Sequence, residues 1–170
     1  MGTHKETVLG VPGIDLPGVV TGLDFLREAR LNGKVNVGKK VVVLGGGNVA
    51  FDCARTAHRL GATEINLVCP ERYEDMPAEP SEIKQGEEEG IAIHGSRLAC
   101  KITSRNEHVA GVECLRLRSM EFDEDGKLHF DAIEGSEVVM PADTVILAIG
   151  QEPDLSFLPG DIKANRGMIS

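Results

Sequence analysis

Residues 41–50 read VVVLGGGNVA, an apolar run that leads directly into three glycines. Gly45, Gly47 and Ala50 occupy the small-residue positions of the pattern G-x-G-x-x-[G/A], which places a dinucleotide pyrophosphate at a helix N-terminus. Gly45 allows the tight turn, Gly47 leaves room for a phosphate at the backbone, and Ala50 lets the helix approach the strand. The chemistry that this spacing predicts is the binding of a phosphorylated cofactor.

The sequence on either side of the glycines predicts the elements that would hold such a turn. A helix is expected over 51–60 and a second strand over 64–69, so the turn lies inside one βαβ unit. The backbone N–H groups of Asn48 and Val49, next to Gly46, would face the phosphates, because a helix N-terminus carries about half a positive charge. A strand, turn and helix that bind nothing are the alternative interpretation.

An acidic and a basic residue follow the second predicted strand. Glu71 stands 21 residues after Ala50, about where an acid that binds the hydroxyls of the adenosine ribose is expected. A carboxylate there repels a 2′-phosphate, whereas the adjacent Arg72 could bind one. We therefore expect Glu71 or Arg72 at the ribose, with NAD modestly favoured over NADP. An exposed surface acid is the alternative for Glu71.

The remaining elements are predicted from apolar patterns and turn residues. A helix capped by Thr21 is expected to end near Gly33, after a loop over 6–22 that holds two proline–glycine turns. A polar helix is expected over 81–89, and residues 76–78 before it either line the adenosine side or start that helix. Strands that alternate apolar and polar residues predict an antiparallel meander after a short strand at 91–94: 98–104, 109–118, 127–131 and 137–140.

The last apolar segment, residues 143–150, is typical of a central strand in a parallel sheet. Ala148 and Gly150 at its end would leave room for the nicotinamide half of the cofactor. The predicted fold is therefore α/β, a Rossmann-like three-layer nucleotide-binding domain with a three-stranded parallel core, this last buried strand and an antiparallel β-meander crossover.

Composition and charge exclude several classes of protein. With 41% hydrophobic and 26% charged residues, the 170-residue chain is typical of a globular domain, and its net charge of −9 argues against nucleic acid or an anionic membrane as partner. No apolar run is long enough to span a membrane. The four cysteines and five histidines show no metal-ligand spacing, so we expect no metal site, free thiols and a cytoplasmic location.

Longer motifs are similar to one family of flavoproteins. Residues 45–62 read GGGNVAFDCARTAHRLGA, against the pattern G-G-G-N-x-A-x-D-x-A-R-x-A-x-R-L-G-A. Residues 74–78 (EDMPA), 88–91 (EEGI) and 150–154 (GQEPD) match its later motifs E-E-M-P-A, E-E-G-V and G-x-x-P-D. The chain resembles the nicotinamide-binding domain of the FAD-dependent pyridine nucleotide oxidoreductases of the glutamate synthase small (beta) subunit group.

This resemblance implies an activity and a domain arrangement. Family members pass electrons between NAD(P)H and FAD, and on to or from an iron–sulfur centre or a partner such as the glutamate synthase large subunit. FAD is held by a separate domain whose sequence flanks the nicotinamide domain on both sides. We thus expect residues 36–150 to bind NAD(P), with 1–35 and 151–170 leading to a flavin domain. FAD is expected only in the full-length protein, so this chain alone would be inactive.

The sequence departs from the family at the ribose. Members that use NADPH typically read V-Y-R-R after the second strand, whereas residues 68–71 here read VCPE.

No acid–base residue is needed from this domain, so we assign no catalytic residue. A stand-alone nucleotide-binding or sensor module without turnover is the alternative. A short-chain dehydrogenase is excluded, because Tyr73 is followed four residues later by Pro77 in place of the required lysine.

Overall fold

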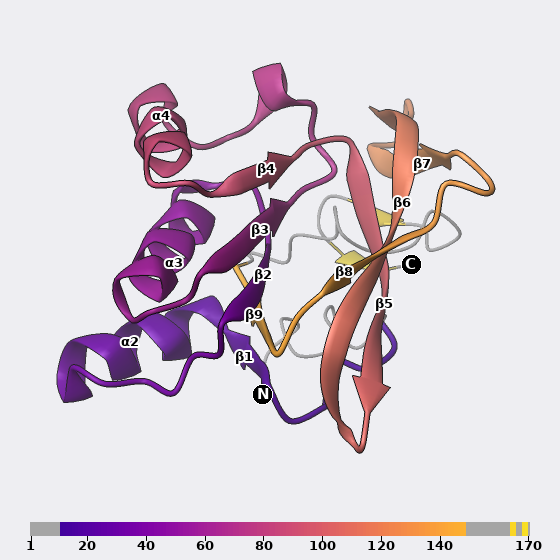
Figure 1. Cartoon of the computed structure of the whole chain (residues 1–170). Coiled ribbons are helices and arrows are strands. Elements are labelled where there is room, and N and C mark those ends of the chain that lie inside the picture. Colours follow the sequence, from indigo (N-terminus) through magenta and orange to yellow (C-terminus); the bar gives the residue numbers. More distant parts are fainter. Residues whose placement is uncertain (1–10, 149–163, 166–167, 170) are drawn as a thin grey trace.

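A parallel sheet of five strands forms the middle layer of the computed structural model, which describes residues 11–148, 164–165 and 168–169 (Figure 1). All neighbouring strands in this sheet run parallel. Their order is β1 (Val19–Thr21), β9 (Thr144–Leu147), β2 (Lys40–Leu44), β3 (Glu64–Val68) and β4 (Ala92–His94). The carboxyl ends of β2, β3 and β9 therefore meet at one edge, where parallel α/β sheets bind ligands.

Helices cover one face of this sheet and antiparallel strands cover the other (Figure 1). On β2, Val41 and Val43 belong to the core shared with the helices, while Val42 and Leu44 belong to the core on the opposite face. Burial on both faces explains why this strand is apolar at successive positions. The helices are α2 (Gly22–Asn32), α3 (Asn48–Arg59) and α4 (Pro80–Glu88), with a short 3₁₀ helix, η1 (Tyr73–Asp75), before α4.

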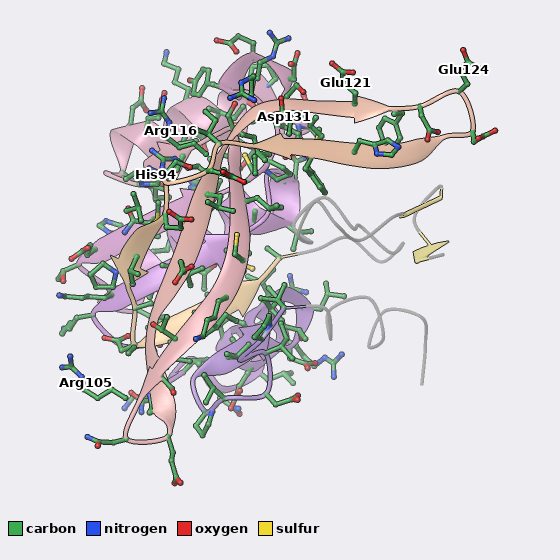
Figure 2. All side chains as sticks on the ribbon, turned by 90° about the vertical axis from the view of Figure 1, so that its right-hand side faces the viewer. His94, Arg105, Arg116, Glu121, Glu124 and Asp131 are labelled. Carbon is green, nitrogen blue, oxygen red and sulfur yellow. The ribbon has the colours of Figure 1, made fainter. Side chains whose placement is uncertain are left out.

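The third layer is built around one long strand, β6 (His108–Phe122). The first part of β6 pairs with β5 (Arg97–Arg105) and with β8 (Val138–Pro141), and its outer part pairs with β7 (Lys127–Ala132). Two short strands, β10 (Ala164–Asn165) and β11 (Met168–Ile169), continue the sheet beyond β7. The β6–β7 hairpin projects from the body of the domain (Figure 2).

The predicted α/β class, its three layers and its antiparallel crossover are confirmed. The Thr21 side chain accepts a hydrogen bond from the Asp24 amide and caps α2, which ends at Gly33 in the left-handed conformation, as the sequence predicts. The predicted strands at 64–69 and 91–94 are present as β3 and β4.

Four details of the prediction are wrong. Residues 19–21 form the edge strand β1 and not a loop, because three residues between a turn and a helix cap are too few to show a pattern. The parallel sheet consequently has five strands and not the four predicted, which were the three of the core and the last buried strand. Helix α3 starts at Asn48, three residues earlier than predicted. The fourth meander strand, β8, pairs with β6 and not with β7. Strand β7 pairs only with the outer part of β6, so the edge beside the first part of β6 stays open for β8.

Phe51 tests the packing of the helical layer. Its side chain is fully buried in the core between the sheet and the helices, and its ring lies against Gly86 of α4. Phe51→Ala should lower the free energy of unfolding by about 3–5 kcal/mol in urea titrations, because it leaves a cavity. Leu31→Ala, at a position 74% exposed, is the control and should change it by less than about 0.5 kcal/mol. Equal effects of the two variants would contradict this packing.

Candidate functional site

The glycine turn connects β2 to α3 at the carboxyl edge of the parallel sheet. Gly45 has φ +143°, and a side chain there would overlap the carbonyl oxygen of Ala148. The amide of Gly45 donates to the Val68 carbonyl at 2.9 Å, and the amide of Ala148 donates to the Leu44 carbonyl at 2.9 Å. Hydrogen bonds to both neighbouring strands therefore fix the turn, and they bring the predicted residues Gly45 and Ala148 into contact.

The next two glycines face different surroundings. A β-carbon on Gly46 would lie 3.1 Å from the Cβ atom of Cys69, so this residue packs onto the end of β3. A β-carbon on Gly47 would meet no atom within 4 Å among the described residues. Gly47 therefore faces open space, on the side where the predicted phosphates would approach.

The first turn of α3 is suited to an anion. Gly47 is its N-cap, no side chain caps the helix, and the first turn contains no acidic residue. The N–H groups at such an end carry partial positive charge and need acceptors. Ala50 is fully buried, which lets α3 pack closely against the sheet, and Val49 lies partly buried against the same core. These residues fit a pyrophosphate at the turn.

A segment that the sequence left ambiguous supports the turn from the outside. The amide of Ala78 donates to the Gly46 carbonyl at 3.1 Å, and the amide of Glu79 donates to the Asn48 side-chain oxygen at 2.8 Å. Met76 and Ala78 are buried, and α4 starts only afterwards, at Pro80. Residues 76–79 thus hold the glycine turn in place, a role that sequence reasoning missed.

Glu71 lies beneath the glycine turn. Its Oε2 atom would be 3.2 Å from a β-carbon on Gly46, and the side chain is partly buried, so the structure does not show a fully exposed surface acid. Burial, and secondarily the Glu71 carboxylate, raise the pKa of the neighbouring Cys69 thiol to about 12. Cys69 is therefore a neutral thiol at physiological pH and unsuited to redox chemistry.

Arg72 points to the solvent and is engaged by a carboxylate. Its side chain is exposed, and its Nε atom lies 2.7 Å from Oδ2 of Asp75. The hydrogen bond to Asp75 and its charge raise the pKa of Arg72. The structure thus places both candidate ribose residues at the end of β3, with the acid nearer to the turn. Gly150, predicted at the nicotinamide, lies outside the described residues.

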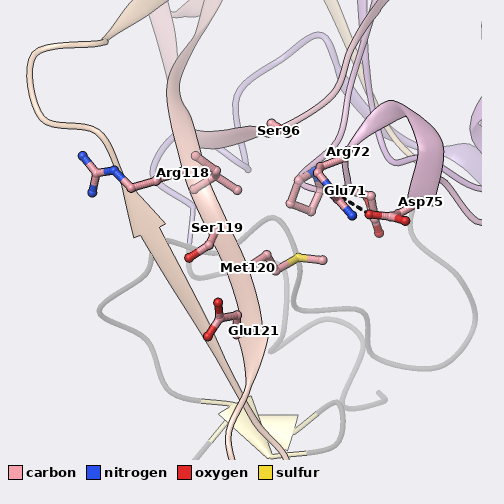
Figure 3. A pocket seen from close by; sticks show the side chains of 10 residues that line it. Glu71, Arg72, Asp75, Ser96, Arg118, Ser119, Met120 and Glu121 are labelled. Atoms are coloured by element: carbon pink, nitrogen blue, oxygen red, sulfur yellow. Dashed lines mark hydrogen bonds and ion pairs between the residues drawn. The ribbon is translucent and has the colours of Figure 1, made fainter.

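A pocket of about 310 Å³ adjoins Glu71 (Figure 3). One side is formed by the loop after β3, and the other by the outer part of β6, which sequence reasoning did not connect with the site. The residues that line it are Pro70, Glu71, Arg72, Asp75, Ser96, Leu117, Arg118, Ser119, Met120 and Glu121. Glu71 therefore lies next to the glycine turn and also lines this pocket.

An ion-pair network lies behind the site, between two helices. Arg55 of α3 binds Glu89 at 3.0 Å and Glu82 at 3.3 Å, and the hydrogen bond to Glu89 is the main cause of the raised pKa of this guanidinium. This pairing joins α3 to α4 and assigns Arg55 a structural role.

The comparisons with known proteins agree with this geometry. The family model described as pyridine nucleotide-disulphide oxidoreductase matches residues 1–169. The chain belongs to this family. It is 43% identical over 165 residues to the NADPH-Fe(3+) oxidoreductase subunit beta of Geobacter sulfurreducens, a match that covers 95% of this chain and 25% of that protein.

Two further relatives are subunits by name. The NADP(+)-dependent formate dehydrogenase subunit beta of Moorella thermoacetica is 38% identical, over 99% of this chain and 24% of its own length. The glutamate synthase [NADPH] small chain of Halomonas elongata is 37% identical, over 90% of this chain and 34% of its own length. These identities confirm the predicted family. The chain spans about a quarter to a third of the length of these relatives.

Solved structures show the same fold. FprA of Mycobacterium tuberculosis in complex with NADPH has a TM-score of 0.64 at 17% identity, and the match covers 87% of this chain and 48% of that one. Thioredoxin reductase of T. acidophilum has a TM-score of 0.62 at 22% identity, over 95% and 47% of the two chains. Among the residues that the structure describes, no helix is long and apolar enough to cross a membrane, and no group of three or more histidine, cysteine, aspartate or glutamate side chains is placed to hold a metal ion.

Gly47→Val and Gly45→Val should separate binding from folding. Gly47 faces open space, so a valine there should leave the melting temperature nearly unchanged and block the approach of a pyrophosphate. Calorimetric titration with NADH should then show no binding. Valine at Gly45 must adopt φ +143° against the Ala148 carbonyl, which costs at least about 1–3 kcal/mol of stability. Unchanged NADH affinity in Gly47→Val would mean that this turn does not hold phosphates.

Proposed function

We propose that this chain is the NAD(P)H-binding domain of a FAD-dependent oxidoreductase, which passes electrons between NAD(P)H and FAD and on to or from an iron–sulfur centre or a partner subunit. The observation that carries the proposal is the open space at Gly47, in front of a helix N-terminus that no side chain caps. A pyrophosphate supplies both the negative charge and the acceptors that such an end requires.

The chain's own contribution to this reaction is to position the cofactor. The pyrophosphate would bind Gly45, Gly46 and Gly47 and the N–H groups of Asn48 and Val49. The small residue Ala148, next to Gly45, leaves room for the cofactor to continue toward its nicotinamide end. The nicotinamide exchanges a hydride with the flavin when both are bound, and the protein supplies orientation and electrostatics.

The flavin itself is assigned to the rest of a longer protein. We propose that residues 36–150, with β1 and α2 packed against them, form the NAD(P) domain, and that the segments before and after lead to a FAD domain in the same full-length chain. The partial coverage of the relatives supports this, as do their names, which describe subunits such as a glutamate synthase small chain. The cysteines Cys53, Cys69, Cys100 and Cys114 are free, which supports a reducing, cytoplasmic location.

Charge around the ribose position supports NAD over NADP. Glu71 lies beneath the turn, and the two arginine residues of the adjoining pocket both bind carboxylates. Arg72 binds Asp75, and Arg118 binds both carboxylate oxygens of Asp131 at 2.9 Å. A 2′-phosphate would therefore meet a carboxylate before it met an unoccupied cation. Several relatives carry NADPH or NADP in their names, so this preference is proposed for this chain alone.

Two substitutions test the cofactor preference. NADH should raise the melting temperature more than NADPH at equal concentration, with about 2.7 kcal/mol of stabilisation at 100 times its dissociation constant. Glu71→Arg should narrow or reverse this order, because a guanidinium binds a phosphate with two hydrogen bonds. Asp75→Asn should strengthen NADPH binding alone, since it releases Arg72. Stronger stabilisation of the unmodified chain by NADPH would show that Arg72, and not Glu71, controls the choice.

Electron transfer is tested in the full-length protein. NADH should bleach its flavin absorbance under anaerobic conditions, and Gly47→Val should abolish bleaching while the FAD content stays the same. The 170-residue chain alone should be purified without flavin absorbance. Stoichiometric flavin in this chain would contradict the assignment of FAD to a separate domain, and bleaching that persists in Gly47→Val would contradict the role of the turn.

A further inference from the structure

We infer that Arg97 and Arg116 form a second anion site, which binds a doubly charged oxyanion such as phosphate and is separate from the glycine turn. Arg97 is the first residue of β5, and Arg116 of β6 is its direct partner in the antiparallel pairing. The two side chains therefore lie on the same face of the strand pair, where like charges repel each other. This inference goes beyond the proposed function, because it assigns no part of the cofactor to the site.

Both arginines lie at one end of the core between the two sheets. Arg116 is two positions from Cys114 on β6 and so shares its face, and Cys114 is buried in that core. His94, at the end of β4, is opposite Val68, which belongs to the same core. Figure 2 shows His94 and Arg116 near the base of the projecting hairpin. Arg116 is exposed and Arg97 is partly buried, so the site opens to solvent at this end.

The two guanidinium groups lack a partner in the part of the chain that the structure describes. Neither side chain makes a hydrogen bond or an ion pair there, and the Nη1 atom of Arg97 is buried. Buried charged groups are normally paired or hydrogen-bonded, because the loss of hydration is otherwise uncompensated. A buried guanidinium nitrogen without a partner, opposite a second guanidinium, therefore points to an anion that binds both.

The groups next to Arg97 do not neutralise its charge. Burial, and secondarily the charge of Arg97, lower the pKa of His94, so this imidazole is uncharged at physiological pH. Its Nε2 atom lies 2.8 Å from the side-chain oxygen of Asn66, which carries no charge either. Burial raises the pKa of Cys114 to about 12, although Arg97 acts in the opposite direction. Arg97 thus acts on groups of both β4 and β6, and these groups are neutral.

A phosphate dianion matches the two arginines in charge and in hydrogen bonding. Each guanidinium is planar and donates two parallel hydrogen bonds to phosphate oxygens in its preferred geometry. One dianion balances both positive charges, whereas a monocarboxylate balances only one of them. A water molecule would satisfy the Nη1 atom of Arg97 but would leave the repulsion between the two arginines. The ligand class is therefore inorganic phosphate or a small phosphate monoester.

This site faces away from the pocket beside Glu71. That pocket is lined by Leu117, the neighbour of Arg116 on β6, and by neither Arg97 nor Arg116. Adjacent residues of a strand point to opposite faces, so the two arginines are on the other side of the strand pair. A phosphate ion there would bind whether or not a dinucleotide occupies the glycine turn.

Calorimetric titration of the full 170-residue chain with sodium phosphate, at an ionic strength held constant with sodium chloride, tests the site. Arg116→Ala should bind phosphate at least about tenfold more weakly than the unmodified chain, because half of the donors are lost. Arg105→Ala is the matched control, since Arg105 is exposed at the opposite end of the same strand pair (Figure 2). Its phosphate affinity should stay within about twofold. Equal affinities of Arg116→Ala and the unmodified chain, or no saturable binding, would overturn the inference.

The melting temperature of Arg97→Met tests the buried guanidinium. In chloride this variant should melt no lower than the unmodified chain, because it removes an uncompensated buried charge. Phosphate stabilises proteins in general, so the readout is the difference in gain between the two chains when phosphate replaces chloride. The unmodified chain should gain more. A variant that melts lower in chloride and gains as much from phosphate would overturn the inference, because Arg97 would then be satisfied within the fold.

Gly47→Val and the dinucleotides separate this site from the glycine turn. Gly47→Val should bind phosphate as well as the unmodified chain does, and saturating NADH or NADPH should leave the phosphate affinity unchanged. Loss of phosphate binding in Gly47→Val, or competition by either dinucleotide, would place the phosphate in the cofactor site and overturn the inference. Glycerol 3-phosphate, titrated in parallel, should also lose affinity in Arg116→Ala if the natural ligand is a monoester. Phosphate binding without any NADH binding would contradict the proposed function and leave this site standing.

Discussion

The contact between Gly45 and the Ala148 carbonyl is the constraint on which the candidate site depends. It brings the end of β2 so close to the end of β9 that no side chain fits between them. The hydrogen bond from Gly45 to Val68 ties the same residue to β3. The ends of β2, β3 and β9 are held together at Gly45, so the chain must turn sharply into α3. The first N–H groups of α3 then point away from the sheet. Backbone geometry alone thus creates a helix N-terminus that suits an anion.

Neighbouring residues support this turn and set the charge around it. Residues 76–79 hold the outside of the turn with two backbone N–H groups, and Arg55 holds α4 against α3. Glu71 supplies a carboxylate next to the turn, which suits a ribose diol more than a phosphate. Beside Glu71, a pocket lies between the loop after β3 and the outer part of β6, which carries Met120. In the proposed function, the hydrogen-bonded turn would bind the phosphates and the residues around it would select the cofactor.

Local patterns in the sequence predict much of this structure. Short-range rules predict the glycine turn, the Thr21 cap and the buried parallel strands, because each of these depends on residues that are close together in the sequence. Strand β1 does not, since three residues become a strand only through hydrogen bonds to β9, more than a hundred positions away. The pairing of β8 with β6 likewise depends on which strand edge remains free.

The site shows the same division between local and long-range effects. The placement of Gly45, Gly47 and Glu71 around one turn follows from their spacing, because the motif is local. The role of residues 76–79 depends on hydrogen bonds to the turn some thirty positions earlier, and the E-D-M-P-A motif at 74–78 marked the segment without revealing its contact. The position of Met120 at the pocket could not be predicted from the sequence, because a single extra residue in the pairing, Arg118, decides which face of β6 Met120 occupies.

The most direct test of the account is a map of amide chemical shifts during titration of the ¹⁵N-labelled chain with NADH. The account predicts that the largest changes occur at the amides of Gly46, Gly47, Asn48 and Val49, with smaller changes at Glu71. ADP-ribose, which lacks the nicotinamide, should produce the same pattern at these residues. Saturable changes that leave residues 45–50 unaffected, or no changes at all at millimolar NADH, would contradict the claim that this turn binds a dinucleotide.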